Sequence, residues 1–321
     1  MEVRARAASS WRRAAPARAG TRKELFPQAP RGHEHWSAAP PANTGDGLRL
    51  GESAGGSIDA NLQDAGAWSP VSRLPNGDGT FMNYPHLIDR GKPGVIAVTA
   101  RGNRFGNEAD SYHGFMRHLF AAIEPGAEVA AWLVCDHRFQ RRYGLGASKP
   151  FPVSLKRYQR SGYLVTAPTI EELARRCGID PAGLKATVDF YNRHAREGRD
   201  PAFDRGGTPY NRVSGDPDHK PNPCVAPIEH GPFHAVKIVP GSLGTFAGLK
   251  TDAAARVLGN DNRPIPGLYA TGNDMSSVMG GHYPSGGITL GPAMTFGYLA
   301  ALDMVARGGA AEMDDIGAAA D

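Results

Sequence analysis

The residues that could do chemistry gather in one stretch near the end of the chain, GGHYPSGGITLGPAMTFG at 280–297. It combines Tyr283 with many glycines, a density that usually means something must approach the backbone closely, since glycine has no Cβ. The N–H groups at 287–290 fall at the expected start of a helix, where they lack intrahelical partners and, with the helix dipole, stabilise negative charge. A reduced flavin develops such charge at the pyrimidine end of its ring. The stretch therefore predicts a ligand site, and the alternative is a glycine-rich loop that binds nothing.

Two neighbouring elements must position this stretch. A helix is expected over 290–307, because Pro292 falls in its first turn and Gly308 and Gly309 follow its end. The segment LYAT at 268–271 is expected to be a strand, and it continues directly into a polar GND turn. A strand, a polar turn and a glycine-rich approach to a helix N-terminus are together typical of sites that hold charged or electron-rich ligands.

The middle of the chain carries clear helix signals. Thr169 and Glu172 form a capping-box pattern, and Gly178 follows the helix that they begin. Asp180 and Pro181 are an N-cap and a first-turn proline for a second helix, which is expected to end near 198. Its apolar residues recur on one face that we expect to be core: Leu184, Val188, Tyr191 and Ala195.

Other elements are expected from shorter patterns. Asp46 is a potential N-cap of a helix over 46–54, and residues 199–232 are rich in proline and are expected to form a long loop. Short apolar, partly β-branched runs predict three further strands, at 94–99, 129–135 and 235–239.

The bulk composition excludes several classes of protein. Residues 1–23 carry seven Arg or Lys and one Glu, so this segment accounts for the whole net charge of +4 and no nucleic-acid surface is indicated. We expect residues 1–21 to be a disordered or misassigned tail, although the segment could imitate a transit peptide. No apolar run is long enough to span a membrane.

Cysteine and histidine spacing argues against a metal site or a disulfide framework. The three cysteines, Cys135, Cys177 and Cys224, are far apart and suit a reducing compartment, so a cytoplasmic protein is expected. His33 and His35 bracket Glu34, but no third ligand follows at helical spacing, and ordinary loop histidines are the better interpretation.

The segments GLYATGND and YPSGGITLGPAMTFGYLAA resemble the carboxy-terminal flavin motif of the fumarate reductase and succinate dehydrogenase flavoprotein superfamily. NTGDG at 43–47, RGNRFGNEADSY at 101–112 and PGSLGTFAGLKTD at 240–252 extend the resemblance over 22–308. It implies FAD as the cofactor. It also implies FAD contacts from five residues, the last two through backbone N–H groups at the flavin ring: Asp46, Gly272, Asn273, Thr289 and Leu290.

Within the superfamily the chain is similar to the 3-ketosteroid Δ1-dehydrogenase branch. Fumarate reductases place arginines where this chain has Tyr112 and Pro284, and a dicarboxylate needs such cations. The branch implies that Tyr283 and the Gly287 N–H bind a ketone oxygen and that Tyr112 takes the neighbouring proton. Ser285 and Gly286 stand where the branch commonly has Gly-Pro. The substrate expected is small and hydrophobic, a 3-ketosteroid or similar, with an external electron acceptor.

The GxGxxG fingerprint with which this superfamily begins does not occur after any strand. We therefore expect the chain to be the back part of a larger enzyme, of α/β or α+β class. Residues 22–72 and 244–309 are assigned to a partial FAD-binding domain, 73–243 to an inserted substrate (capping) domain, and 310–321 to a tail. Two alternatives stay open: an FAD-dependent alkene reductase working in the opposite direction, and a non-catalytic truncated fragment.

Overall fold

A computed structural model of the chain describes residues 35–38, 45–59 and 61–318. The chain forms two compact units that alternate along the sequence. The central unit contains 35–38 and Trp68–Ser242, and the split unit contains 45–59, 61–67 and 243–318. The expected basic tail 1–21 lies outside the described residues, as do His33 and Glu34. The cofactor and substrate roles assigned to the two regions stay predictions.

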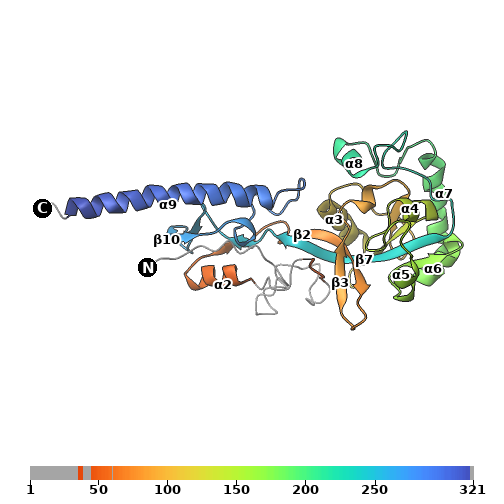
Figure 1. Ribbon diagram of the computed structural model, residues 1–321, viewed down its shortest axis with the longest axis horizontal. Coiled ribbons are helices and arrows are strands. Elements are labelled where there is room, and N and C mark those ends of the chain that lie inside the picture. Colours follow the sequence, from red (N-terminus) through yellow and green to blue (C-terminus); the bar gives the residue numbers. More distant parts are fainter. Residues whose placement is uncertain (1–34, 39–44, 60, 319–321) are drawn as a thin grey trace. The chain divides into compact units, whose positions relative to one another are not determined.

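The central unit is built on a six-stranded sheet with the strand order β3-β2-β7-β5-β4, to which β6 is added by pairing with β7 (Figure 1). The pairs β2 with β3, β4 with β5, and β7 with both β5 and β6 are antiparallel. The strands predicted at 94–99, 129–135 and 235–239 are confirmed as β4, β5 and part of β7. The strands of this sheet are β2 (Gly66–Pro75), β3 (Phe81–Pro85), β4 (Val95–Val98), β5 (Ala131–Cys135), β6 (Val165–Ala167) and β7 (Phe233–Thr245).

The two helices predicted in the central unit begin where the sequence predicts them, and the unit's other helices were not predicted. The Thr169 hydroxyl accepts from the Glu172 N–H at 3.2 Å, and Gly178 ends that helix at φ 71°. Asp180 accepts from the Ala182 N–H at 3.1 Å. The long 199–232 loop is interrupted by one short helix. The helices of this unit are η1 (Asp89–Gly91), α3 (Tyr112–Ala122), α4 (His137–Arg142), α5 (Lys156–Arg160), α6 (Ile170–Cys177), α7 (Pro181–Ala195) and α8 (Pro209–Ser214).

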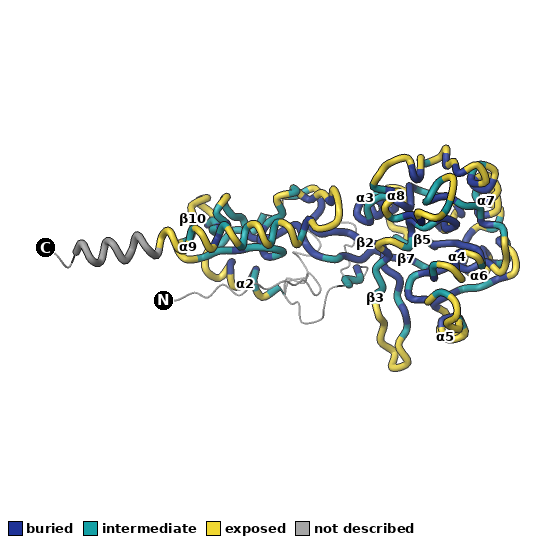
Figure 2. The backbone as a smooth tube through the Cα atoms, turned by 45° about the horizontal axis from the view of Figure 1, so that its top comes forward, coloured by how far each residue is buried: buried dark blue, intermediate teal, exposed yellow. Residues whose placement is uncertain are grey.

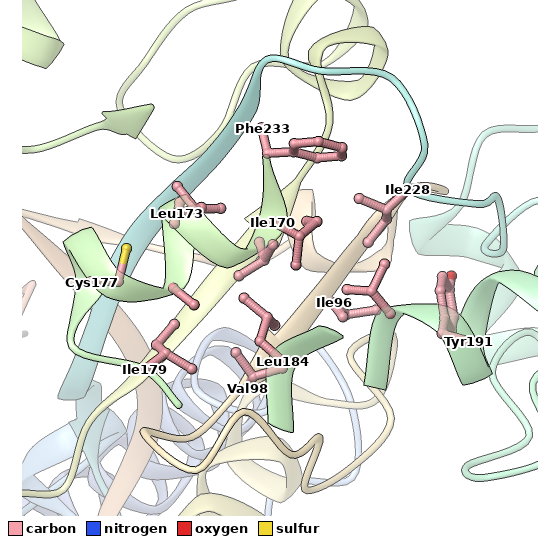
Figure 3. Close-up of a cluster of buried hydrophobic side chains, with 14 of the residues drawn as sticks. Ile96, Val98, Ile170, Leu173, Cys177, Ile179, Leu184, Tyr191, Ile228 and Phe233 are labelled. Atoms are coloured by element: carbon pink, nitrogen blue, oxygen red, sulfur yellow. The ribbon is translucent and has the colours of Figure 1, made fainter. Parts of the chain in front are cut away.

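The core of the central unit lies where α6 and α7 meet the sheet (Figure 3). Ile96 and Val98 from β4 contact a cluster that includes Leu173 of α6 and Leu184 of α7, and all four are fully buried. The apolar face expected on α7 is confirmed, because its four residues are buried. Such burial stabilises a side chain by about 1.5–3 kcal/mol, so this cluster fixes α6 and α7 on the sheet.

The split unit brings two distant segments together. Its amino-terminal part provides α2 (Asp46–Ser53) and β1 (Ile58–Asp59), and its carboxy-terminal part provides β8 (Gly248–Leu249), β9 (Arg256–Leu258), β10 (Pro264–Tyr269), η2 (Gly272–Asp274) and α9 (Leu290–Ala318). β1 pairs with β8, and β9 pairs with β10. A Cβ on Gly51 would lie 2.3 Å from Leu249, so only glycine lets α2 pack this closely on β8. This packing holds 45–59 against the segment that carries the expected flavin motif.

One predicted N-cap and one predicted helix end are wrong. Gly45, at φ 76°, is the N-cap of α2, and Asp46 is the first helical residue, paired with Arg49. The last helix does not stop at 307, because α9 continues to Ala318 through part of the expected tail. Gly308 and Gly309 each cost a helix only about 1 kcal/mol. No proline follows them and the next residues are rich in alanine.

The described residues contain no cluster of three His, Cys, Asp or Glu that could hold a metal ion. All three cysteines are free and buried. Over the same part of the chain, every helix is too short or too polar to cross a membrane. The cytoplasmic location stays a prediction.

Candidate active site

A cleft lies at the N-terminus of α9 in the split unit. Its walls come from the end of β7 and the residue after it, the η2 turn, the segment that follows this turn, and the first turn of α9. Three of the five predicted cofactor residues line it: Gly272, Asn273 and Thr289. The other lining residues are Thr245, Phe246, Met275, Ser276, Ser277, Val278, Ile288 and Pro292.

The other two predicted cofactor residues do not line this cleft. Asp46 is exposed on α2, and Leu290 is the first residue of α9, with its side chain largely in solvent. The role predicted for Leu290 uses only its backbone N–H, and first-turn N–H groups of a helix have no intrahelical partner. The Leu290 N–H thus stays a candidate to bind a ligand in the cleft. Asp46 acts on the site only through its charge, which helps to raise the pKa of Asp274 in η2.

The glycines of the 280–287 loop have different reasons to be glycine. Gly281 has φ 85°, and a Cβ there would lie 2.7 Å from the Asp64 backbone nitrogen, so it allows close contact between two stretches of this same chain. Gly287 has φ 91°, yet a Cβ there would meet nothing within 4 Å. A Cβ on Gly280 or Gly286 would likewise meet nothing, so the loop has open space at three glycines, of which Gly287 lies next to the N-terminus of α9.

Tyr283 lies four residues before Gly287 in the same loop and is buried, with its ring 6.4 Å from that of Phe246. Burial raises the pKa of Tyr283 above that of a free phenol. The hydroxyl therefore keeps its proton at neutral pH and can donate a hydrogen bond. This is the state that the predicted role of Tyr283 requires.

Asp274, at the end of the η2 turn, is a functional candidate that the sequence did not reveal. Its side chain is buried against the start of α2: a Cβ on Gly47 would lie 2.4 Å from Asp274 Oδ2. Its Oδ1 has no hydrogen-bond partner among the described residues. Burial, and after it the charge of Asp46, raise the pKa of Asp274 to about 6. A buried carboxyl with one unused oxygen beside the cleft residue Asn273 can accept a hydrogen bond from a ligand hydroxyl.

Tyr112 belongs to the central unit, where it is the first residue of α3. It is buried, and the Ser111 hydroxyl caps the helix by accepting from the Gly114 N–H at 3.1 Å. The preceding RFGNE residues form a rigid base for this helix start. Arg104 binds Glu108 through two nitrogens at 2.8 and 2.6 Å, and Asp200 through two at 2.8 Å each.

The same Glu108 is the centre of a buried charge network. It also accepts from the Ala97 N–H at 3.0 Å and from Arg205 at 3.2 Å. Burial acts to raise the pKa of Glu108, but Arg104 and Arg205 outweigh it and hold the pKa below its usual value. The motif that helps to carry the family resemblance thus lies in a buried charge network and ends four residues before Tyr112.

The structure therefore places Tyr283, Gly287 and the flavin-motif residues together in the split unit and Tyr112 in the central unit. All of these residues were predicted from the sequence, on the motifs that carry the family resemblance. Asp274 gave no such signal, because its burial depends on α2, more than two hundred residues earlier in the chain.

A protein-family model described as "FAD binding domain" matches residues 3–290. Among curated proteins, the 4-oxocyclohex-2-ene-1-carboxylate 5-dehydrogenase of Sinomonas cyclohexanicum is 43% identical over 291 residues, which cover 91% of this chain and 49% of that protein. The 3-oxosteroid 1-dehydrogenase of Mycolicibacterium smegmatis is 40% identical over 280 residues, or 86% of this chain and 48% of that protein.

Among solved structures, the 3-ketosteroid Δ1-dehydrogenase of Sterolibacterium denitrificans, in complex with 1,4-androstadiene-3,17-dione, matches with a TM-score of 0.78 at 37% identity. The match covers 89% of this chain and 52% of that one. The chain thus spans about half the length of the relatives it matches.

Proposed function

The chain belongs to the FAD binding domain family, within the superfamily of fumarate reductase and succinate dehydrogenase flavoproteins, and from that premise we propose that it carries the catalytic part of an FAD-dependent dehydrogenase. The proposed reaction removes a proton and a hydride from adjacent carbons beside the ketone of a neutral cyclic substrate. The observation that carries the proposal is the loop on which the buried phenol of Tyr283 and the open backbone of Gly287 follow each other into α9.

The residues of the cleft fit the flavin end of FAD. The open, left-handed Gly287 and the Leu290 N–H at the start of α9 suit an electron-rich, flat ring system. The unused Oδ1 of Asp274 suits a hydroxyl of the chain that links ring and phosphate. When bound, FAD would supply the acceptor for the hydride.

Tyr283 and Gly287 would act on the ketone oxygen. A phenol that keeps its proton and a backbone N–H can both donate to an oxygen on which negative charge develops, and such donors stabilise an enolate as an oxyanion hole does. The charge that they stabilise makes the neighbouring α-proton more acidic. The loop that carries Tyr283 and Gly287 would therefore both bind and activate the ketone.

Tyr112 would take the α-proton. A phenol with a reference pKa near 10 is a weak base at neutral pH, so its role requires that the proton be shared with a neighbouring group. The charge network behind α3 holds the residue in one position for this transfer.

The proposed substrate class follows from the lack of arginine at two positions. Tyr112 and Pro284 stand where a dicarboxylate-binding relative needs arginines, so a neutral ketone fits better than fumarate. The relatives at 40–43% identity are named for an oxosteroid and an oxocyclohexene carboxylate. Both names describe cyclic ketones, but only the oxosteroid is neutral, so the ring ketone is the feature that the two names share. An alkene reductase working in the opposite direction is the second candidate, favoured only by the shared flavin motif.

The test uses flavin-loaded protein with a 3-ketosteroid and with 4-oxocyclohexanecarboxylate as substrates. Tyr283→Phe should lower turnover on the order of 10²–10³-fold with unchanged flavin content, as loss of one oxyanion donor does. The matched control is Tyr269→Phe, which removes a hydroxyl bonded to Asp303 in the same unit and should leave turnover unchanged. Near-full activity of both Tyr283→Phe and Tyr112→Phe would disprove the mechanism. Protein that binds flavin but turns over neither ketone would favour the non-catalytic alternative.

A further inference from the structure

The stretch of the central unit that contains α4, the loop after it and α5 has an unusual balance of charge. Residues 137–170 carry seven Arg or Lys and no Asp or Glu, and all seven cations are exposed. Figure 2 shows α5 on the outside of the central unit, with most of its length exposed. The part that we call the 149–160 patch consists of Lys149, Phe151, Val153, Lys156, Arg157 and Arg160.

The cations of the 149–160 patch differ from other exposed cations of the central unit. Elsewhere in this unit, exposed cations with a carboxylate partner are Arg101, Arg176, Lys185, Arg196 and Arg199. Within the described residues, none of the four cations of the patch has such a partner. Four neighbouring positive charges without a counter-charge attract a negatively charged partner.

The loop of the patch also exposes two apolar side chains. Phe151 is 62% exposed and Val153 is 48% exposed. The loop is held to α4, because the Phe151 N–H donates to the Arg141 carbonyl at 3.0 Å and the Arg141 Cζ lies 4.0 Å from the centre of the Phe151 ring. The Val153 N–H donates to the Pro150 carbonyl at 3.1 Å. These contacts hold the loop in a conformation that leaves both apolar side chains in water.

The cations of α5 point away from the interior of the central unit. At about 100° per residue, Lys156, Arg157 and Arg160 fall within an arc of about 100°. Tyr158 lies on the other side of this helix and is buried. The exposed side of α5 therefore carries three cations, and it directly follows the loop with Phe151 and Val153.

An anionic membrane surface fits this combination of groups. Surface-binding segments place apolar side chains in the headgroup region and Lys or Arg beside them, where the cations meet lipid phosphates. Each Lys or Arg near such a surface strengthens binding about fivefold. The centre of a protein interface is instead depleted in charged residues, and in Lys especially. A patch with four cations and two apolar side chains is thus closer to a lipid-binding surface.

We propose that the 149–160 patch attaches the protein to an anionic phospholipid surface. Phe151 and Val153 enter the headgroup region, and the four cations bind lipid phosphates. The inference rests on neither the proposed reaction nor the cofactor.

The test sediments the full chain with vesicles of phosphatidylglycerol and phosphatidylcholine in equal amounts, and with vesicles of phosphatidylcholine alone. The chain should bind the anionic vesicles more tightly, and added salt should weaken this binding. Lys156→Gln combined with Arg160→Gln should weaken it about 30-fold, because two cations are lost. Phe151→Ser should weaken it on the order of 10-fold, because one apolar side chain no longer leaves water.

Matched controls remove the same kinds of group elsewhere on the central unit. Arg175→Gln combined with Arg193→Gln removes two exposed cations from α6 and α7, and Phe190→Ser removes a ring that is 41% exposed on α7. Both controls should bind the vesicles as the unchanged chain does. Circular dichroism should show every variant to be folded, since all the positions are exposed. Turnover and flavin content do not enter this assay, so failure of the proposed reaction and failure of this proposal can be told apart.

Four results would overturn the proposal. The unchanged chain could fail to bind the anionic vesicles. The patch variants could bind as tightly as the controls, which would assign the binding to other cations such as the seven in residues 1–23. A DNA duplex could bind as tightly as the vesicles and be unaffected by Phe151→Ser, which would make nucleic acid the occupant. Light scattering could show a homodimer that Phe151→Ser abolishes, which would make a second copy the occupant.

Discussion

Glu108 in the central unit and Asp274 in the split unit are both buried carboxyl groups, but their surroundings differ. Glu108 accepts from two arginines and a backbone N–H, and its pKa is held below the usual value. Asp274 has an unused oxygen, and its pKa is raised to about 6. Both oxygens of Glu108 are therefore bonded to protein groups, whereas Asp274 keeps one oxygen that a ligand can use.

Further features of the two units differ as well. In the central unit a chain of hydrogen bonds runs from Tyr163 through Ser72 and His86 to Asp89, with spacings of 2.6, 2.7 and 2.6 Å. In the split unit the backbone at Gly287 is open, because a Cβ there would meet nothing within 4 Å. The comparison teaches that arginines hold a buried carboxylate in the central unit, whereas the split unit has a buried carboxyl with an unbonded oxygen beside the cleft residue Asn273.

The largest expected effect on stability tests the central unit. Glu108→Gln should lower the free energy of unfolding by about 3–5 kcal/mol, because it leaves Arg104 and Arg205 buried without their shared partner. Urea denaturation followed by tryptophan fluorescence reports this unit, which contains Trp36, Trp68 and Trp132.

The matched control is Glu128→Gln, which removes an exposed carboxylate bonded to Lys237 and should cost no more than about 1 kcal/mol. An equally small effect of Glu108→Gln would mean that the buried network adds little to the scaffold.

The next effect tests the split unit through pH. The pKa of Asp274 is raised from 3.8 to about 6, so its favourable contribution is complete below pH 3.8 and is lost as pH rises through 6. The unchanged chain should therefore lose up to about 3 kcal/mol of split-unit stability from this group between pH 4 and pH 7, and Asp274→Asn should not.

Urea denaturation followed by far-ultraviolet circular dichroism at the two pH values measures the difference. Asp46→Asn should remove the smaller part of the dependence, since the Asp46 charge is the lesser cause. Identical pH profiles of Asp274→Asn and the unchanged chain would contradict the assignment.

A smaller effect on stability distinguishes Gly281, which packs against the backbone at Asp64, from Gly287, which is open. Both Gly281→Ala and Gly287→Ala strain a left-handed residue, at about 1–2 kcal/mol. Gly281→Ala should cost more, because its Cβ would also clash with the backbone at Asp64. Melting temperatures by circular dichroism rank the two variants, and a larger loss for Gly287→Ala would show that the loop packs differently.

Local sequence signals predicted part of the central unit, namely two of its helices and three of its strands. The Thr169 cap, the Asp180 and Pro181 start and the strand at 129–135 all depend on neighbouring residues, and all are confirmed. The errors came where local signals were weak. Glycine after 307 did not end α9, and Gly45 displaced Asp46 as the cap of α2.

The candidate site was only partly predictable, for a tertiary reason. The flavin-motif residues follow each other along the chain, so their pattern is visible in the sequence. Asp274 becomes unusual only because Gly47 packs against it, and RFGNE becomes a charge network only through Asp200 and Arg205. Contacts between residues so far apart leave no periodic pattern in one sequence.

The most direct test of the proposed FAD site is a titration of the purified chain with FAD, in which flavin absorbance and calorimetry measure the binding. The split unit offers a few hydrogen bonds at about 1 kcal/mol each, against about 12 kcal/mol for nanomolar affinity. The account predicts a dissociation constant above about 1 μM for the chain alone, and tighter binding once a dinucleotide-binding half is added. Submicromolar binding of FAD by the chain alone would contradict it.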